Sequence, residues 1–316
     1  MNPFVSVIVP NYNHELFLET RINSIINQTY QNFELIILDD CSIDNSAEII
    51  ERFRNHAKVN TIVYNKKNSG SPFKQWKKGI EMAKGEWIWI AESDDYCLPE
   101  LLETLVDSTK SCRNTALSYC QSFEADEKGN VERDLSWHVE DLDPKRWKKD
   151  FCNEGLDEIK NFLVYRNTIP NASAVLFRKS AYQKAEKNFE KMKMCGDWLF
   201  WVQLLQQGSI AFKAQPLNFF RQHSVTTRVL DTKEKIIKRL GEEYYVLENI
   251  KRCIEPGKRK IVLNRIDSIL FQYDSLFTNR DIVKYLVRPF SYNEHVPFLS
   301  LLSRYCKNRL RSVLQR

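Results

Sequence analysis

The chain has 316 residues, of which 43% are hydrophobic and 28% are charged, and its formal net charge is +6. This composition is typical of a globular protein and excludes the disordered and membrane-spanning classes, and the length permits one large domain or a main domain with an appendage. No apolar run approaches the roughly 20 residues of a bilayer-spanning helix, and the N-terminus lacks a signal-peptide pattern. We therefore expect a cytoplasmic protein.

The positive charge is concentrated toward the C-terminal end. Residues 231–316 contain 18 Lys and Arg against 10 Asp and Glu, so the preceding residues sum to about −2. Any general attraction to anionic partners belongs to this C-terminal part, and we expect no nucleic-acid partner. The eight cysteines form no Cys-x-x-Cys pair, so we expect reduced, mostly buried thiols and neither a zinc site nor a disulfide framework.

The first 125 residues alternate β-like runs with helical patterns. The β-like runs are 5–10, 33–40, 59–65, 86–92 and 115–124, and the helical patterns are 15–28, 42–55, 72–85 and a segment that starts at Pro99. Strands separated by helices imply parallel pairing through right-handed crossovers. The sequence therefore predicts an α/β fold with an open, mostly parallel sheet flanked by helices.

The remainder of the chain is less regular. A polar insert with tryptophans follows Lys128, the segment "CGDW" opens a helix near residue 195, and the chain from Thr232 onward has a basic, mainly helical pattern. In the last helix, one set of apolar residues shares a face opposite a basic set: Leu301, Leu302, Tyr305, Leu310 and Val313 against Arg304, Lys307, Arg309 and Arg311. Peripheral contact with an anionic inner membrane surface and a packed helical bundle explain this pattern equally well.

Polar clusters follow four of the predicted strands. They are "PNYN", "DDCSIDN", "NKKNSG" and "ESDD". Ligands of open α/β sheets bind at the carboxyl ends of the strands, so four such clusters on one edge predict a single ligand-binding cleft.

The stretch "WIWIAESDDYCLP" ends a predicted buried strand with Glu92, Asp94 and Asp95. Like charges this close repel each other, and a divalent cation relieves that repulsion. Carboxylate ligands combined with phosphate oxygens suit Mg²⁺ or Mn²⁺. A solvated turn with an aspartate capping the next helix is the alternative.

Three other polar sites in the sequence have both a structural and a functional interpretation. Asp39 or Asp40 either makes a turn after the second strand or accepts hydrogen bonds from a ribose or base. Asp197 either caps the helix that Gly208 ends or serves as a general base. His223, beside Arg221, is either a structural histidine or part of a phosphate-binding loop.

Two common nucleotide-binding motifs are absent. The sequence contains neither G-x-G-x-x-G nor G-x-x-x-x-G-K-[ST], which argues against a dinucleotide-binding Rossmann protein and a P-loop NTPase. With only nine glycines, a metal ion is the natural substitute for a glycine-rich phosphate loop.

Taken together, "VSVIVPNYN", "FELIILDDCSIDNS", "NSG", "KGIEMAKGEWIWIAESDD" and "GDW" occur in an order that resembles the family 2 glycosyltransferases. The resemblance covers roughly residues 5–228 and implies the A-type glycosyltransferase fold. It implies a catalytic domain over 1–228, with a nucleotide-binding half over 1–125 and an acceptor half over 126–228. Residues 229–316 would then be a basic helical C-terminal region.

The resemblance also implies roles for individual residues. Pro10, Tyr12 and Asp40 would contact the base of a nucleotide-sugar donor. Glu92 would lie near the ribose or sugar, with His223 also on the donor side. Asp94, and with it Asp95, would bind Mn²⁺ or Mg²⁺, and Asp197 would be the catalytic base of an inverting transfer.

Two positions depart from the family pattern. Glu92 stands where the family usually has aspartate, and the extra methylene weakens the case for direct metal ligation there. The helix after "NSG" commonly carries an arginine that approaches the phosphates, but here it reads "FKQWKKG". Lys74, Lys77 or Lys78 could replace that charge, although the single ammonium of lysine cannot bind a phosphate in the bidentate way of a guanidinium. Trp76 could instead shape the sugar pocket.

From these features we predict an inverting, metal-dependent glycosyltransferase. Its donor is a UDP-sugar or a similar nucleotide-sugar, and its acceptor is a hydroxyl of a cell-surface glycan or of its lipid-linked precursor. The alternative is a catalytically silent sugar-nucleotide-binding or scaffolding protein of the same fold. A sugar-phosphate nucleotidyltransferase is disfavoured because "VPNYNHE" is not a glycine-rich signature.

Overall fold

The computed structural model describes residues 3–223 and 232–256. It contains one ten-stranded sheet whose main path runs β3-β2-β1-β4-β9-β6-β10-β5, with β7 beside β6 and β8 beside β10. The strands are β1 (Val5–Asn11), β2 (Phe33–Asp39), β3 (Val59–Tyr64), β4 (Trp87–Ile90), β5 (Tyr96–Cys97), β6 (Thr115–Ala125), β7 (Val131–Asp134), β8 (Phe151–Asn153), β9 (Val175–Arg178) and β10 (Ser209–Arg221). The predicted α/β class is confirmed.

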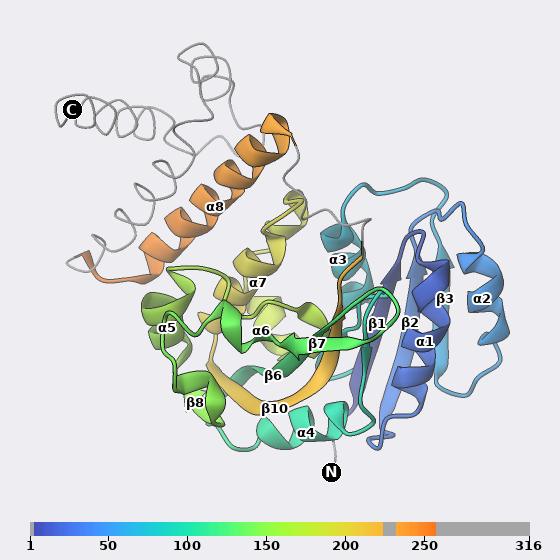
Figure 1. The fold of residues 1–316 in the computed structure, drawn as a ribbon, viewed down its shortest axis with the longest axis horizontal. Helices are drawn as coiled ribbons and strands as arrows, with labels where there is room; N and C mark the ends of the chain where they lie inside the picture. Colours follow the sequence, from blue (N-terminus) through green and yellow to red (C-terminus); the bar gives the residue numbers. More distant parts are fainter. Residues whose placement is uncertain (1–2, 224–231, 257–316) are drawn as a thin grey trace.

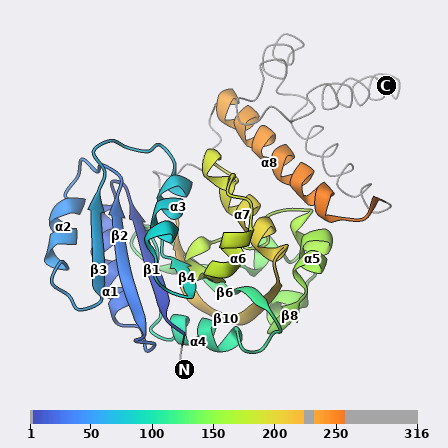
Figure 2. The ribbon, with the colours of Figure 1, turned by 180° about the vertical axis from the view of Figure 1, so that it is seen from behind.

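Helices cover both faces of this sheet (Figures 1 and 2). The α-helices are α1 (Glu15–Ile26), α2 (Ser46–Arg52), α3 (Pro72–Met82), α4 (Leu101–Ser108), α5 (Gly155–Glu158), α6 (Lys179–Lys184), α7 (Gly196–Leu205) and α8 (Lys233–Cys253). Short turns of other helix types are η1 (Leu135–His138), η2 (Arg146–Lys148), η3 (Ile159–Leu163), η4 (Ala172–Ala174) and η5 (Phe189–Lys191). Among the described helices, none is both long and apolar enough to cross a bilayer.

The alternation of side chains along the strands builds two hydrophobic cores. Val5, Val7 and Val9 of β1 point to the core that α1, α2 and α4 complete, whereas Ile8 points to the core that α3, α7 and α8 complete. On the second face α3 approaches β1 closely, because Gly79 has no side chain: a Cβ there would lie 2.4 Å from Ile8 Cγ2. Because both faces are covered, the strands read as continuous apolar runs.

The sheet is mixed near its centre, and this differs from simple parallel pairing of successive strands. β1 to β4 are parallel to one another, but β9 lies antiparallel between β4 and β6. β4 and β6 therefore keep the predicted common direction without being neighbours. The strand β9 comes from the segment "TIPNASAVLFRKSAY", whose short apolar run gave no indication of its pairing partner.

The prediction about the cysteines needs a correction. The expectation of uniformly reduced thiols is wrong, because Cys112 and Cys152 form a disulfide with Cα atoms 5.8 Å apart. β8 pairs with β10, and this pairing brings together two cysteines that are 40 residues apart in sequence.

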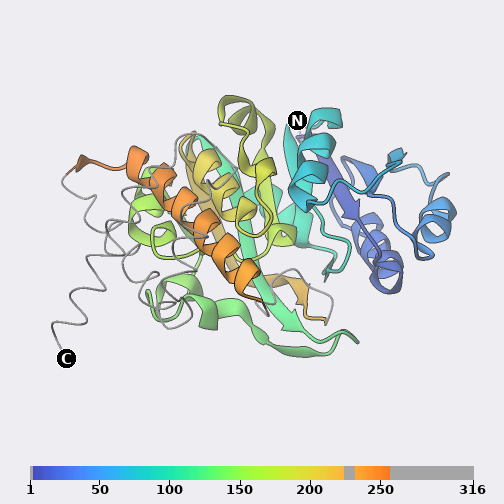
Figure 3. The same ribbon diagram turned by 90° about the horizontal axis from the view of Figure 1, so that it is seen from above.

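The amphipathic helix over residues 301–313 lies outside the described residues. Within them, α8 packs along α7 (Figure 3), and the predicted domain boundaries stay a prediction.

Candidate active site

The predicted polar clusters meet at one edge of the sheet because neighbouring strands are in register there. Asn11 at the end of β1 aligns with Asp39 at the end of β2, and Asp39 aligns with Tyr64 of β3. The Asn11 side-chain amide donates to Asp39 Oδ2 at 2.8 Å, which ties the first two clusters together. The carboxyl ends of these strands therefore form the single edge that the sequence predicts.

Asp40 ties the second cluster to the third. Its carboxylate accepts hydrogen bonds from the side chains of Asn65, Ser69 and Gln75 at 2.6, 2.7 and 2.8 Å, and from the Ser69 main-chain N–H. The residue is 4% exposed. In this arrangement Asp40 fixes the loop between β3 and α3, and its predicted contact with a base stays a prediction. Tyr12, by contrast, is 45% exposed beside this edge.

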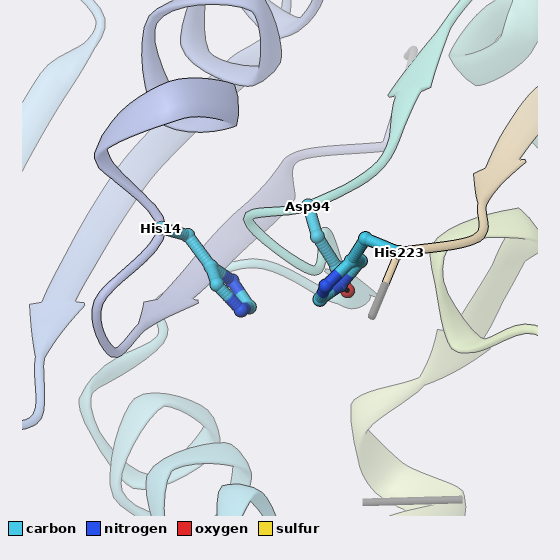
Figure 4. Close-up of side chains that lie close together, drawn as sticks. All are labelled: His14, Asp94 and His223. Carbon is cyan, nitrogen blue, oxygen red and sulfur yellow. Dashed lines mark hydrogen bonds and ion pairs between the residues drawn. The ribbon is translucent and has the colours of Figure 1, made fainter. Parts of the chain in front are cut away.

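Three side chains from distant parts of the chain converge at the end of β4. His14 precedes α1, Asp94 follows β4, and His223 follows β10; each offers one ligand atom, and the three atoms lie within 4.8 Å of one another (Figure 4). His223 Nε2 is 3.1 Å from Asp94 Oδ2, and the Ser93 hydroxyl lies 2.8 Å from His14 Nδ1. This set, which we call the His-Asp-His cluster, was not predicted as a unit.

The electrostatics of the cluster suit a cation. Burial lowers the pKa of His14, although the Asp94 carboxylate opposes that shift, so a neutral imidazole is favoured. A neutral imidazole has a lone pair for a metal. Two imidazoles and one carboxylate are therefore a chemically suitable ligand set for a divalent transition-metal ion.

Asp95 lies apart from this cluster. One of its oxygens accepts hydrogen bonds from Asn171 and Ser173 at 3.0 and 2.6 Å, and the other accepts from the Arg221 main-chain N–H at 3.0 Å. Burial and then the Asp94 charge raise the pKa of Asp95 to about 6. This carboxylate anchors β4 to η4 and β10, and its predicted role as a metal ligand stays a prediction.

Glu92 faces the second core. Its Oε1 accepts a 2.6 Å hydrogen bond from the Trp76 indole N–H, and its main-chain N–H donates to the Ser173 hydroxyl. Burial first and the neighbouring Asp94 second raise the pKa of Glu92 to about 8. Trp76 therefore contacts the position at which the chain departs from the family pattern.

The lysines expected to approach a phosphate have partners elsewhere. Lys78 donates to the Asn65 side chain, Lys74 donates to the Ser69 carbonyl, and Lys77 pairs with Glu190. In this arrangement all three fix the loops around α3.

Asp197 is in the first turn of α7 and is not its N-cap, which is Cys195. Its Oδ2 accepts a 2.9 Å hydrogen bond from the Asn167 side chain, and its Oδ1 accepts from the Trp198 main-chain N–H. Gly196 allows the start of α7 to pack on Phe73, since a Cβ there would lie 2.5 Å from the ring. The helix ends at Leu205, three residues before Gly208.

Arg221 lies at the site, and the sequence did not reveal its role. Its guanidinium donates to the Asp94 carbonyl at 2.9 Å and to the Glu127 carbonyl at 2.7 Å. It also lies over the rings of Phe17 and Tyr96, at 4.9 and 5.0 Å from their centroids. Its position two residues before His223 was the available signal, but its partners Asp94 and Glu127 lie 127 and 94 residues away in sequence.

Comparison with known proteins agrees with this geometry. The family model described as glycosyl transferase family 2 matches residues 6–184, more than half of the chain. The "GalNAc(5)-diNAcBac-PP-undecaprenol beta-1,3-glucosyltransferase" of Campylobacter jejuni is 25% identical over 305 residues, which cover 95% of this chain and 92% of that protein. The glycosyltransferase GlyG of Streptococcus pneumoniae is 41% identical over 106 residues, and the match spans only 35% of its length and 33% of this chain.

Solved structures show the fold. TarS residues 1–349 of S. aureus, in complex with UDP-GlcNAc, superposes with a TM-score of 0.70 at 18% identity and covers 96% of this chain and 89% of its own. The mannosyltransferase PcManGT of Pyrobaculum calidifontis, in complex with GDP-Man and Mn²⁺, has a TM-score of 0.54 at 13% identity and covers 100% of this chain and 88% of its own. The fold is the A-type glycosyltransferase fold, and the chain belongs to glycosyl transferase family 2.

Proposed function

We propose that the protein is an inverting glycosyltransferase that moves a sugar from a UDP-sugar to a hydroxyl of a surface glycan or of a lipid-linked precursor. The observation that carries the proposal is the His-Asp-His cluster at the carboxyl edge of β1 and β4. The UDP-GlcNAc complex of TarS supports the donor, and the name of the Campylobacter jejuni relative supports a lipid-linked acceptor. A cytoplasmic location, with peripheral contact at the inner face of the membrane, is part of this proposal.

His14, Asp94 and His223 would hold the metal. Imidazole nitrogens suit transition metals better than Mg²⁺, which prefers oxygen ligands, so the cluster favours Mn²⁺ of the two ions predicted. When bound, the cation supplies positive charge for the departing diphosphate.

Asp197 would act as the general base. The Asn167 amide and the Trp198 N–H hold both of its oxygens, which orients the carboxylate. The acceptor hydroxyl oxygen would attack the anomeric carbon while Asp197 takes its proton, and the bond to the diphosphate breaks with its electron pair on the leaving group. Attack from the face opposite the leaving group inverts the anomeric configuration.

The donor side is formed by the loops that follow β1, β2 and β4. We propose that Pro10 and Tyr12 contact the base, because the exposed Tyr12 ring at this edge can stack on it. Asp40 would order the adjoining loop, and it would accept from the base in place of one of its four protein donors, because these donors occupy its lone pairs in this arrangement. Glu92 would lie near the ribose or sugar, and the buried Trp76 would orient it through the indole hydrogen bond to Oε1.

Thermal-shift screening of nucleotide-sugars with Mn²⁺, with Mg²⁺ and without metal tests the binding site. We expect the melting temperature to rise with UDP-GlcNAc and Mn²⁺, and to rise less in the Asp94→Asn and His223→Ala variants. Asp107→Asn on α4 is the matched control, since that exposed carboxylate pairs only with Lys110 in the described part of the chain. Equal shifts in melting temperature with and without metal would contradict the proposal that a metal takes part in donor binding.

Turnover tests the chemistry. UDP release with Mn²⁺ should fall by about 10²- to 10⁴-fold in Asp197→Asn with UDP affinity unchanged, since general-base catalysis contributes that much. If wild type and Asp197→Asn are equally inert while nucleotide binds, the chain is a silent sugar-nucleotide-binding protein and the enzyme proposal fails.

A further inference from the structure

Glu242 of α8 makes three hydrogen bonds to the chain segment that leads into α7. Its Oε1 accepts from the main-chain N–H of Lys193 at 2.9 Å, and its Oε2 accepts from those of Met194 and Cys195 at 2.8 and 2.9 Å. The residue is 4% exposed. Hydrogen bonds from N–H groups to a carboxylate are about twice as strong as those between neutral groups, so this contact fixes the segment firmly.

The segment has no cap of its own at this point. Cys195 is the N-cap of α7 and makes no side-chain hydrogen bond to the helix. The N-terminus of a helix carries partial positive charge, which a nearby carboxylate stabilises. Glu242 thus supplies acceptors for the N–H groups of the N-cap and of the two residues before it, and adds a second negative charge to that of Asp197 in the first turn. The helix that carries Glu242, α8, runs beside α7 (Figures 1 and 3).

The same segment is attached on its other side to the loop that Asp40 fixes. The Ser71 hydroxyl donates to the Met192 carbonyl at 3.0 Å, and Lys193 Nζ donates to the Gly70 carbonyl at 2.7 Å. Residues 192–195 therefore lie between the proposed donor side of the site and α8. Asp197 follows two residues later, in the first turn of α7.

We infer that Glu242 is a positioning residue for Asp197: its carboxylate holds the main chain that places the base relative to the donor loop. The inference rests on the proposed function of Asp197 and goes beyond the region matched by the family model, which ends at residue 184. It makes α8 part of the catalytic unit. The basic C-terminal region thereby contributes to the reaction through a glutamate.

Glu242→Gln is the informative variant and Glu243→Gln is its matched control. Glutamine offers one acceptor oxygen, so at least one of the three N–H groups loses its partner. Glu243 is the next residue on α8, is 9% exposed, and pairs with Arg239 at 2.8 Å. Both variants remove one negative charge from the same turn of the same helix. Glu242→Asp keeps the charge but shortens the side chain by one methylene, and serves if the Gln variant does not fold.

Hydrogen–deuterium exchange of the full chain needs no substrate. Amides of residues 193–198 should exchange at least 10-fold faster in Glu242→Gln than in wild type and Glu243→Gln, while β1 and β2 exchange as in wild type. Unchanged exchange at 193–198 would overturn the inference, and so would faster exchange spread evenly over all strands.

Turnover then separates positioning from simple stabilisation. With UDP-GlcNAc and Mn²⁺, kcat per folded molecule should fall about 10- to 100-fold in Glu242→Gln with the Kd for UDP unchanged, because a small displacement of a reacting group has an effect of that size. In an Asp197→Asn background, Glu242→Gln should cause no further loss. A wild-type kcat in Glu242→Gln beside an inactive Asp197→Asn refutes the positioning role alone, whereas an active Asp197→Asn refutes the proposed base and the positioning role together.

Discussion

Arg221 offers a direct test of how the loop that carries Asp94 is held. We consider Arg221→Lys, which keeps the charge but loses the planar guanidinium that bridges the Asp94 and Glu127 carbonyls. Lysine can donate to one of these carbonyls at a time and cannot stack on Phe17 and Tyr96 in the same way. The other carbonyl then loses its donor in a buried environment, since Arg221 is only 7% exposed.

The expected loss in the free energy of unfolding follows from these contacts. A hydrogen bond to a charged group contributes about 1.5–3 kcal/mol, and a cation–π contact contributes about 0.5–1 kcal/mol. Loss of one such bond and weakening of two ring contacts should lower the free energy of unfolding by about 2–4 kcal/mol. The displaced Asp94 loop should also weaken Mn²⁺ binding in the presence of UDP by about 10- to 100-fold, as loss of an outer-shell contact typically does.

Urea unfolding followed by tryptophan fluorescence measures the stability, and calorimetric titration with Mn²⁺ and UDP measures the affinity. Arg133→Lys is the control, because the side chain of Arg133 is 57% exposed in its pair with Glu124 and should change the free energy of unfolding by less than about 1 kcal/mol. Wild-type stability and wild-type Mn²⁺ affinity in Arg221→Lys would refute the reasoning.

Reduction of the Cys112–Cys152 disulfide should lower the free energy of unfolding by about 4 kcal/mol, because the bond closes a loop with a sequence separation of 40. Urea titrations with and without reductant measure this, and a double Cys→Ser variant that still responds to reductant would contradict it. Burial lowers the pKa of His138 below its usual 6.5, so the unfolded chain binds the proton more readily. Stability should be full above pH 6.5 and fall below it, by at most about 1.4 kcal/mol per pH unit for this group. His138→Asn should flatten unfolding curves collected from pH 5 to 8, and an unchanged slope would exclude this histidine.

The sequence alone predicts the fold of the first 125 residues well. β1 to β4 and the helices between them depend on local hydrophobic periodicity, which each segment carries in its own residues. Polar residues after each strand also predict the ligand edge, because parallel neighbours align their carboxyl ends. The order of five motifs predicted the family without any knowledge of which residues touch.

The composition of the site was predicted less completely. Asp94 was expected as a metal ligand and His223 on the donor side, but their meeting with His14 was not. The contacts involved join residues 79 and 129 positions apart, and local patterns carry no information about such pairs. Asp95, one residue from Asp94, points to Asn171 and Ser173 for the same reason: the antiparallel insertion of β9 brings η4 beside β4.

What the sequence determined by itself was the main strands and helices of residues 5–125, the edge of the sheet at which their polar clusters gather, and the family, since these follow from periodicity and motif order. Only the tertiary structure decided which polar side chains lie together, which cysteines pair and which helix holds the segment that leads into α7. Each of those depends on packing between segments far apart in sequence, as the three bonds from Glu242 to residues 193–195 illustrate. Their geometry exists only once the sheet and both of its cores have assembled.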